Sequence, residues 1–308
     1  MNIKKKLRFF LFPLIILFVV LPLSSTVMAA EPKVNLGSTE TYAVLANSTI
    51  TNTGPTVISG TIGGDIGLYP GTSITGFPPG TVGGTTHLTD QAASLAQTDL
   101  VTAYNDAASR TPTMDMSGQD LGGKTLTSGV YFFSSSAQLT GTLTLDGQGD
   151  PEAVFIFQIG SALTTASDSV VSLVNSARFC RVFWQVTSSA TLGTNSQFAG
   201  HIMALESVTA TTGATVQGQL MARNGAVTLD SNTITNGICA AVAAATQTPT
   251  ATAVPTTAAV TLAPTAGTTD LIKTGENNLK QMMIGGLLLV ISGSLVFLLV
   301  SRRKNAIR

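Results

Sequence analysis

Apolar and polar positions alternate between Ser189 and Thr235, and the pattern occurs three times. The three versions read SATLGT at 189–194, SVTATT at 207–212 and AVTLDS at 226–231. A period near 18 or 19 residues is typical of a β-solenoid, in which each coil buries its apolar face only against neighbouring coils. Because side chains alternate along a strand, we expect an inward-facing set: Ala190, Leu192, Val208, Ala210, Val227 and Leu229.

The polar positions of the same repeats predict a row of outward threonines. Thr191, Thr209 and Thr228 are the shared positions, and neighbouring strands lie about 4.7 Å apart, so the three hydroxyls would stand in line. The run 139–145 supplies a second set of outward threonines, which either extends this face or lies on another. The candidate surface residues are therefore Thr191, Thr194, Thr209, Thr211, Thr212, Thr228 and Ser231, with Thr140, Thr142 and Thr144 from the second set.

Other segments predict the remaining elements. Strand-like runs occur at 129–133, 139–145, 153–159 and 182–186, and the last contains Trp184, which we expect to be buried. In the repeats we expect Ile202, Ala204, Leu220 and Ala222 to face inward, with Met203 and Met221 forming an outward apolar pair.

The period changes between Leu88 and Arg110, where the spacing is helical and Thr89–Asp90 supplies a cap. This pattern predicts one amphipathic helix that lies on the two methionines. Its expected apolar stripe consists of Ala92, Leu95, Ala96, Leu100, Ala103, Tyr104 and Ala107.

Both ends of the chain carry export and anchoring signals. Residues 1–30 have a basic start, an apolar core and a small-residue cleavage region, typical of a secretory signal peptide cut after Ala29 or Ala30. The apolar segment 282–300 is long enough for one transmembrane helix, and the basic residues of 301–308 belong on its cytoplasmic side. We therefore expect an extracellular, surface-anchored protein.

The exported part divides into a folded domain at 31–240 and a stalk at 241–270, whose Thr, Ala and Pro composition cannot bury a core. Residues 271–276, LIKTGE, resemble the Leu-Pro-x-Thr-Gly cell-wall sorting signal, with Ile272 in place of its proline. Two modes of anchoring follow: attachment to the cell wall through a sortase-like enzyme, or retention in the membrane.

Charge and cysteine content limit the kinds of ligand and site that the folded domain is expected to have. The folded domain has fourteen acidic residues against six basic ones, so we expect it to lack the basic surface patch that binds nucleic acid. Its two cysteines, Cys180 and Cys239, form one disulfide in an oxidising compartment or remain two buried thiols.

The stretch 146–152 is read as a turn, not a calcium loop. His87 and His201 are read as polar surface positions, and no metal or cofactor is expected.

Four segments resemble the microbial ice-binding proteins of the DUF3494 type: 70–80, 149–159, 182–186 and 222–234. The resemblance runs from about Leu36 to Cys239, essentially the whole folded domain. It implies a discontinuous right-handed β-solenoid of triangular section with one long α-helix packed alongside. It also implies adsorption to an ice crystal surface through one flat face.

The family's ice face tends to carry Thr-Ala/Gly-x-Thr/Asn strings, and residues 209–212, TATT, fit that pattern fully. Residues 228–231, TLDS, depart from it at Leu229 and Ser231. Asp230 is the least favourable element of the threonine row, because a charged, strongly hydrated group disturbs ordered surface water. The function predicted is that of a surface-anchored ice-binding protein, which inhibits ice growth and recrystallisation or attaches the cell to ice.

The alternatives are a surface adhesin or glycan-binding solenoid, and a polysaccharide-degrading β-helix. A glycan site favours exposed aromatics, which make up only 6% of the chain. A glycosidase needs clustered acids, which the pattern does not place on one face. We therefore expect no enzyme activity.

Overall fold

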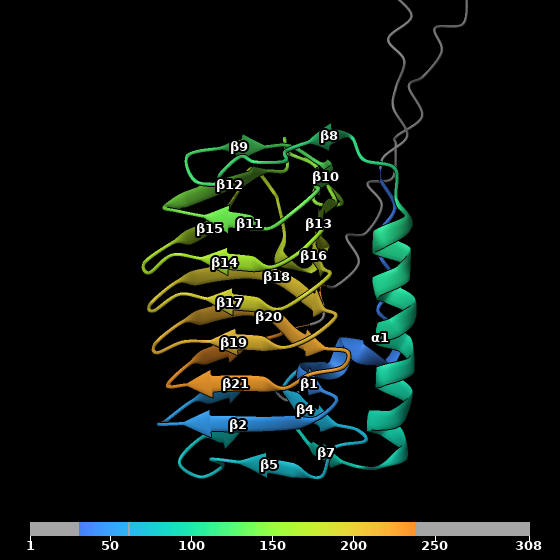
Figure 1. The fold of residues 1–308 in the computed structure, drawn as a ribbon, viewed down its shortest axis with the longest axis vertical. Coiled ribbons are helices and arrows are strands. Elements are labelled where there is room, and N and C mark those ends of the chain that lie inside the picture. Colours follow the sequence, from blue (N-terminus) through green and yellow to red (C-terminus); the bar gives the residue numbers. More distant parts are fainter. Residues whose placement is uncertain (1–30, 61, 238, 240–308) are drawn as a thin grey trace, which may run out of the picture. The chain divides into compact units, whose positions relative to one another are not determined.

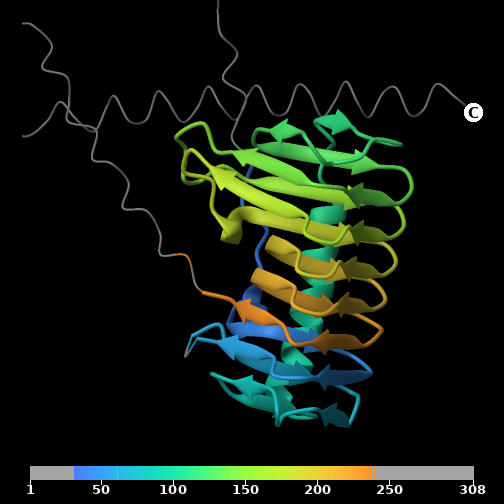
Figure 2. The same ribbon diagram turned by 90° about the vertical axis from the view of Figure 1, so that its left-hand side faces the viewer.

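The computed structural model describes residues 31–60, 62–237 and 239. Within this part of the chain, short strands predominate and there is one long α-helix, so the domain is mostly β as predicted. The strand pairs are parallel, with one register shift between Tyr42 and Val44, and they build three stacks of strands that we call A, B and C (Figure 1, Figure 2). Successive segments of the chain contribute to A, B and C in turn.

Stack A contains β8 (Met114–Asp115), β10 (Gly129–Phe133), β13 (Phe155–Ile159), β16 (Val182–Val186), the second halves of β18 (Gln197–Ala204) and β20 (Thr215–Ala222), β1 (Tyr42–Ala46), β4 (Asp65–Leu68) and β7 (Thr86–Leu88). Stack B contains β11 (Ala137–Leu139), β14 (Leu163–Thr165), β17 (Ala190–Leu192), β19 (Val208–Ala210), β21 (Val227–Asp230), β2 (Thr49–Thr53) and β5 (Ser73–Thr75). Stack C contains β9 (Thr125–Leu126), β12 (Thr142–Asp146), β15 (Val170–Val174), the first halves of β18 and β20, β22 (Thr233–Thr235), β3 (Val57–Ser59) and β6 (Thr81–Val82).

The order of coils in space differs from their order in the chain. The last coil pairs with the first: β20 with β1, β21 with β2, and β22 with β3. Helix α1 (Gln91–Ser109) carries the chain from β7 at one end of the stacks to β8 at the other (Figure 1). Two short 3-10 helices, η1 (Gly37–Thr41) and η2 (Phe179–Arg181), complete the fold. The discontinuous arrangement of coils is thus present in the structure.

Two apolar cores hold these elements together. The larger core lies between the three stacks and includes the inward set predicted from the repeats, together with Ile202, Ala204, Leu220 and Ala222. A second core joins stack A to the helix, where Met203 and Met221 pack with Leu100 and Ala103. The predictions for these positions are confirmed, and α1 covers the outer face of stack A.

The helix begins three residues later than the pattern suggested. Leu88 ends β7, and Asp90 caps the helix by accepting a hydrogen bond from the Ala93 backbone N–H at 2.8 Å. The predicted cap is therefore confirmed, but the predicted start is wrong, because Leu88 pairs with Leu68 of β4 instead.

Two residues of the expected helix stripe face solvent. Ala92 is exposed and Leu95 is 54% exposed, so their assignment to the buried face is wrong. Ala93 and Gln97 are buried in their place. The polar Gln97 is accommodated because its side-chain amide donates to the Ala222 carbonyl at 3.3 Å.

The strand predictions hold with one exception. Trp184 is fully buried, and its indole N–H donates to the Ala199 carbonyl at 3.0 Å. The run 139–145, however, is not one strand. It is divided between β11 and β12, because the chain turns from stack B to stack C at Gly141.

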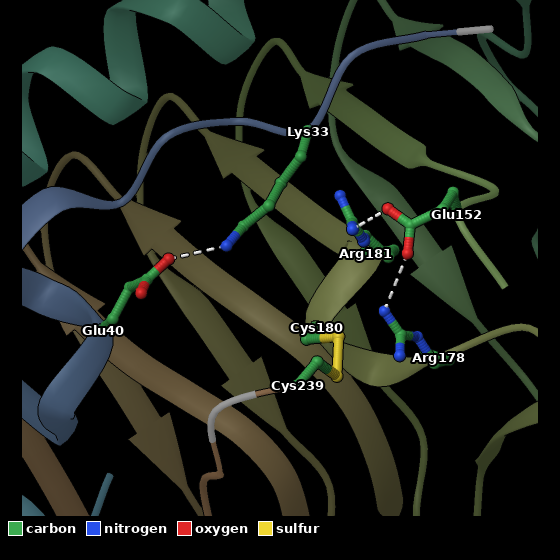
Figure 3. Close-up of a disulfide and its surroundings, with 7 residues drawn as sticks. All are labelled: Lys33, Glu40, Glu152, Arg178, Cys180, Arg181 and Cys239. Atoms are coloured by element: carbon green, nitrogen blue, oxygen red, sulfur yellow. Dashed lines mark hydrogen bonds and ion pairs between the residues drawn. A yellow bond between two sulfur atoms is a disulfide. The ribbon is translucent and has the colours of Figure 1, made fainter. Parts of the chain in front are cut away.

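The disulfide predicted for an exported domain is present. Cys180 in η2 is bonded to Cys239, with 6.0 Å between their Cα atoms. Figure 3 shows three ion pairs near the bridge: Lys33 with Glu40, and Glu152 with both Arg178 and Arg181. The alternative of two free thiols is excluded.

His201 does not occupy the polar surface position predicted for it, since its side chain is only 3% exposed. Strand β18 turns the imidazole outward from stack A, but the N-terminal segment covers it, so that Lys33, Leu36 and Glu40 share a cavity of about 20 Å³ with the ring. Burial is the main cause that lowers the pKa of His201 to about 3, and the charge of Lys33 adds to it. His87 is half-buried and pairs with Asp90.

The signal peptide, stalk, sorting-like motif, apolar segment and tail lie outside the described residues. Within 31–60, 62–237 and 239, no helix is both long and apolar enough to span a membrane.

We predict that His201 makes the domain less stable in mild acid. Its pKa is lower in the folded chain, about 3, than its ordinary 6.5, so between these values the unfolded state binds a proton that the native state does not. The free energy of unfolding should therefore fall from pH 6.5 downwards, by up to about 1.4 kcal/mol per pH unit from this group. Urea unfolding at pH 7 and pH 5 should show a smaller loss in a His201→Gln variant than in the parent. Equal losses would contradict this.

A second prediction concerns the corner where β20 passes from stack C to stack A. Gly218 has φ of +142°, and a Cβ there would lie 2.0 Å from the Gly200 carbonyl oxygen. We expect Gly218→Ala to cost about 2–4 kcal/mol, because strain and a backbone clash act together. Gly123→Ala is the control, since Gly123 also has a positive φ (+73°) but no atom within 4 Å of the added carbon. Equal stability losses in thermal unfolding of the two variants would refute the clash.

Candidate functional site

Stack B is the most regular exposed face of the domain. Stack A is covered by α1, whereas the outer sides of stacks B and C face solvent in the described part of the chain. Among the seven strands of stack B, Asp230 is the only charged residue. A face with a single charged residue, made of parallel strands, is therefore available for binding.

Six threonines stand in register along the middle of this face. The strand pairing puts each one directly beside the next, across β14, β17, β19, β21, β2 and β5. We call this set the threonine ladder: Thr164, Thr191, Thr209, Thr228, Thr51 and Thr75. Strand spacing of about 4.8 Å makes it roughly 24 Å long.

The ladder is assembled from both parts of the discontinuous chain. Thr51 comes from the first coil and Thr228 from the last, and their hydroxyl oxygens lie 3.4 Å apart. The repeats revealed Thr191, Thr209 and Thr228, but sequence reasoning missed Thr51, Thr75 and Thr164. The alternation in the segment 49–53, TITNT, was the available signal for Thr51. Its place beside Thr228 had no sequence signal, because 177 residues separate them.

The other residues predicted from the repeats lie where stack B turns towards stack C. The Thr211 hydroxyl donates to the Leu192 carbonyl at 2.8 Å, and its oxygen lies 3.4 Å from that of Thr194. The Asp230 carboxylate accepts hydrogen bonds from Thr212 and from Ser231, the latter at 3.1 Å. These hydroxyls thus hold the edge of the face together, and two of them fix the one carboxylate beside the ladder.

The second set of threonines does not extend the ladder. Thr142 and Thr144 lie on β12 of stack C, opposite Val170 and Ser172 of β15. Thr140 occupies the corner before them, and its backbone N–H donates to the Asp120 carboxylate at 2.9 Å. The question left open by the sequence is therefore answered by the topology: these threonines belong to a different face.

Stack C is less regular than stack B. In spatial order its outward row contains Val170, Gln197, Thr215, Thr233 and Val57, so only two of these five neighbouring positions are threonine. A hollow of about 500 Å³ lies between the end of β15 and the strands β18, β20 and β22. This face can hold a ligand in a depression but does not present a flat array.

Acidic side chains of the turn at 146–152 hydrogen-bond or form ion pairs with other residues of the same domain. Asp146 accepts from the backbone of Gln148 and the side chain of Asn175, while Glu152 pairs with two arginines. Among the described residues, no group of three His, Cys, Asp or Glu side chains is placed to hold a metal ion. Residues 148–149 and 151–152 lie in turns, as predicted for this stretch.

Comparison with known families identifies two parts of the chain. Residues 44–235 match the model of the ice-binding-like family, and residues 273–306 match that of the LPXTG cell wall anchor motif. An ice-binding protein of Nostoc sp. (strain HG1) is 54% identical over 202 residues, covering 65% of this chain and 73% of the relative.

Solved structures give the same result. A crystal structure of an ice-binding protein from an Antarctic biological consortium has a TM-score of 0.65 at 46% identity, covering 68% of this chain and 93% of that one. An ice-binding protein from the Antarctic ascomycete Antarctomyces psychrotrophicus has a TM-score of 0.64 at 43% identity, covering 67% of this chain and 100% of that one. The chain is a member of the ice-binding-like family with a cell-wall anchor motif at its C-terminal end.

Proposed function

We propose that this protein adsorbs to ice through the threonine ladder while its C-terminal segment holds it at the cell surface. The observation that carries the proposal is the register of six threonines on a face with a single charged residue. The family membership and the relatives' ice-binding character support it.

Threonine suits an ice-binding array for physical reasons. Its hydroxyl anchors a water molecule, and its methyl group limits further hydration, so waters near the lattice spacing can merge with an ice surface. The β-branched side chain occupies few rotamers, which reduces the entropy lost when it is ordered. Because neighbouring coils fix the backbone of every rung, the array is set before it meets ice.

The proposal also includes the handedness of the coils and the shape of their cross-section. We infer a right-handed winding of the coils and a triangular section, as the resemblance to the family implies. Three stacks that share one interior core support this geometry. A triangular section would keep stack B flat, which twisted open sheets are not.

We infer that the chain is exported by the signal peptide at 1–30 and that the stalk at 241–270 separates the domain from the envelope. The anchor match at 273–306 supports attachment to the cell wall by a sortase-like enzyme, although Ile272 replaces the proline of the sorting signal. Retention through the apolar segment 282–300 in the membrane, with the tail 301–308 in the cytoplasm, is the other mode that we propose. Neither mode requires catalysis by this chain, a cofactor or nucleic acid.

A glycan-binding role is the second candidate, and the hollow on stack C favours it. Amides and hydroxyls of Gln197, Gln217 and Thr233 surround it, with the apolar side chain of Leu173 on one wall. Such a lining hydrogen-bonds neutral polyols, but it contains no exposed aromatic ring for a sugar to stack on. The ladder therefore remains the stronger site.

We predict that Thr209→Tyr abolishes most of the ice activity of residues 31–240, because the ring projects from the middle of the ladder and keeps neighbouring rungs from the ice. Ice recrystallisation and crystal shaping are the measurements. Thr233→Tyr on stack C is the matched control, since it adds the same ring to an exposed strand position. Both changes should alter the free energy of unfolding by about 0.5 kcal/mol or less.

Loss of ice activity in both variants would show that a large side chain interferes with ice binding on either face. Activity lost only in the Thr233 variant would move the site to stack C. If the parent domain itself left ice growth unchanged, the glycan-binding candidate would take precedence.

We also predict that Asp230→Asn increases ice activity. The carboxylate is the one charge on the strands of stack B and is strongly hydrated, whereas an amide keeps an oxygen that accepts from Ser231. Thermal hysteresis and recrystallisation measured at equal concentration should both improve in the variant. Unchanged or lower activity, with an unchanged melting temperature, would show that the charge is not a defect of the face.

A further inference from the structure

The described chain ends in the middle of the stacks and not at one of their ends. Strand β22, the last one, lies between β20 and β3, and β21 before it lies between β19 and β2. Figure 2 shows β22 in orange, between the blue first coils and the yellow coils. The segment that leads to the anchor therefore leaves from the coil that joins the two parts of the discontinuous fold.

Without a further connection, tension on that segment would act directly on β22. This strand has three residues, and the backbone hydrogen bonds beside it include Thr233 N–H to the Ala214 carbonyl at 3.2 Å and Val57 N–H to the Asn232 carbonyl at 2.8 Å. A strand pulled from its end loses such bonds one after another. The next strand to be drawn out is β21, which would remove Thr228 from between Thr209 and Thr51.

The disulfide provides a different path for the force. Cys239 is bonded to Cys180, which is 5% exposed and lies in η2 directly before β16. Strand β16 pairs along its full length with β13 and over four residues with β18. Tension that arrives at Cys239 can thus pass through a covalent bond into an interior strand, without passing through β22.

The surroundings of the bridge hold both of its ends. On one side, Glu152 pairs with Arg178 and Arg181, which flank Cys180 (Figure 3). On the other, the Asn236 side-chain amide donates to the carbonyls of Glu40 at 3.0 Å and Tyr42 at 3.1 Å. Asn236, the residue directly after β22, is therefore fixed to the first coil.

We propose that the Cys180–Cys239 disulfide is a mechanical clamp that carries tension from the surface anchor into β16 and so protects the junction of β21 with β2. The source of the tension rests on the proposed surface-anchored function; the clamp itself is a property of the domain. With the clamp closed, the chain between residues 180 and 239 cannot be extended from its C-terminal end. With it open, β22 and β21 become the first strands to leave.

Single-molecule stretching tests this proposal on the domain with its stalk, residues 31–270, held by handles at the two ends. In the oxidised parent, we expect the final coil to resist until the main unfolding event. In the Cys180→Ser/Cys239→Ser double variant, we expect an earlier, separate step that releases β21 and β22, from Val227 to Cys239. At roughly 3.4 Å per residue this step is about 44 Å of extended chain.

Reduction of the folded, tethered parent with a phosphine is the control for a variant that fails to fold, and it should produce the same early step. A disulfide that only adds thermodynamic stability would lower the main unfolding force on reduction without an early step, and that result would overturn the proposal. Ice shaping by the double variant in the absence of tension separates the two ideas. Shaping retained together with the early step supports the clamp, whereas the absence of shaping in both proteins refutes the ice function alone.

Discussion

The contact between the last coil and the first is the interaction on which the structure depends. Strand β21 lies in register on β2, with Val227 directly over Ile50 and both side chains fully buried. This pairing closes one interior core over coils that lie far apart in the sequence. It also makes a single array of threonines out of two sequence segments, so the fold and the candidate site rest on the same contact.

The helix follows from that arrangement. Since the N-terminal coils occupy one end of the stacks, the chain must travel their length before it can begin the coils at the other end, and α1 covers that distance along stack A (Figure 1). Because α1 packs against Met203 and Met221, the outer face of stack A is covered and is not available for binding. Of the two that remain, stack B is regular and almost uncharged, whereas stack C is interrupted by a hollow.

The periodicity of the sequence predicted those features that depend only on contacts within one coil or between residues close in the sequence. The inward aliphatic residues of the repeats, the cap at Asp90 and the burial of Trp184 all depend on neighbours close in sequence or on composition. The residues that escaped prediction depend on distant partners. Thr51 entered the ladder through a coil 177 residues away, and His201 became buried because the N-terminal segment covers it. A mostly β fold with one long helix was predictable from the sequence, but half of the ladder was not.

Thr51 therefore gives the most direct test of the central claim, that ice is bound by the assembled ladder and not by the repeat segment alone. The measurement is the fraction of protein incorporated into a slowly growing ice front, for residues 31–240 and for their Thr51→Tyr variant. The account predicts that the variant is excluded from the ice while its melting temperature stays close to that of the parent. Equal incorporation of both proteins would contradict it.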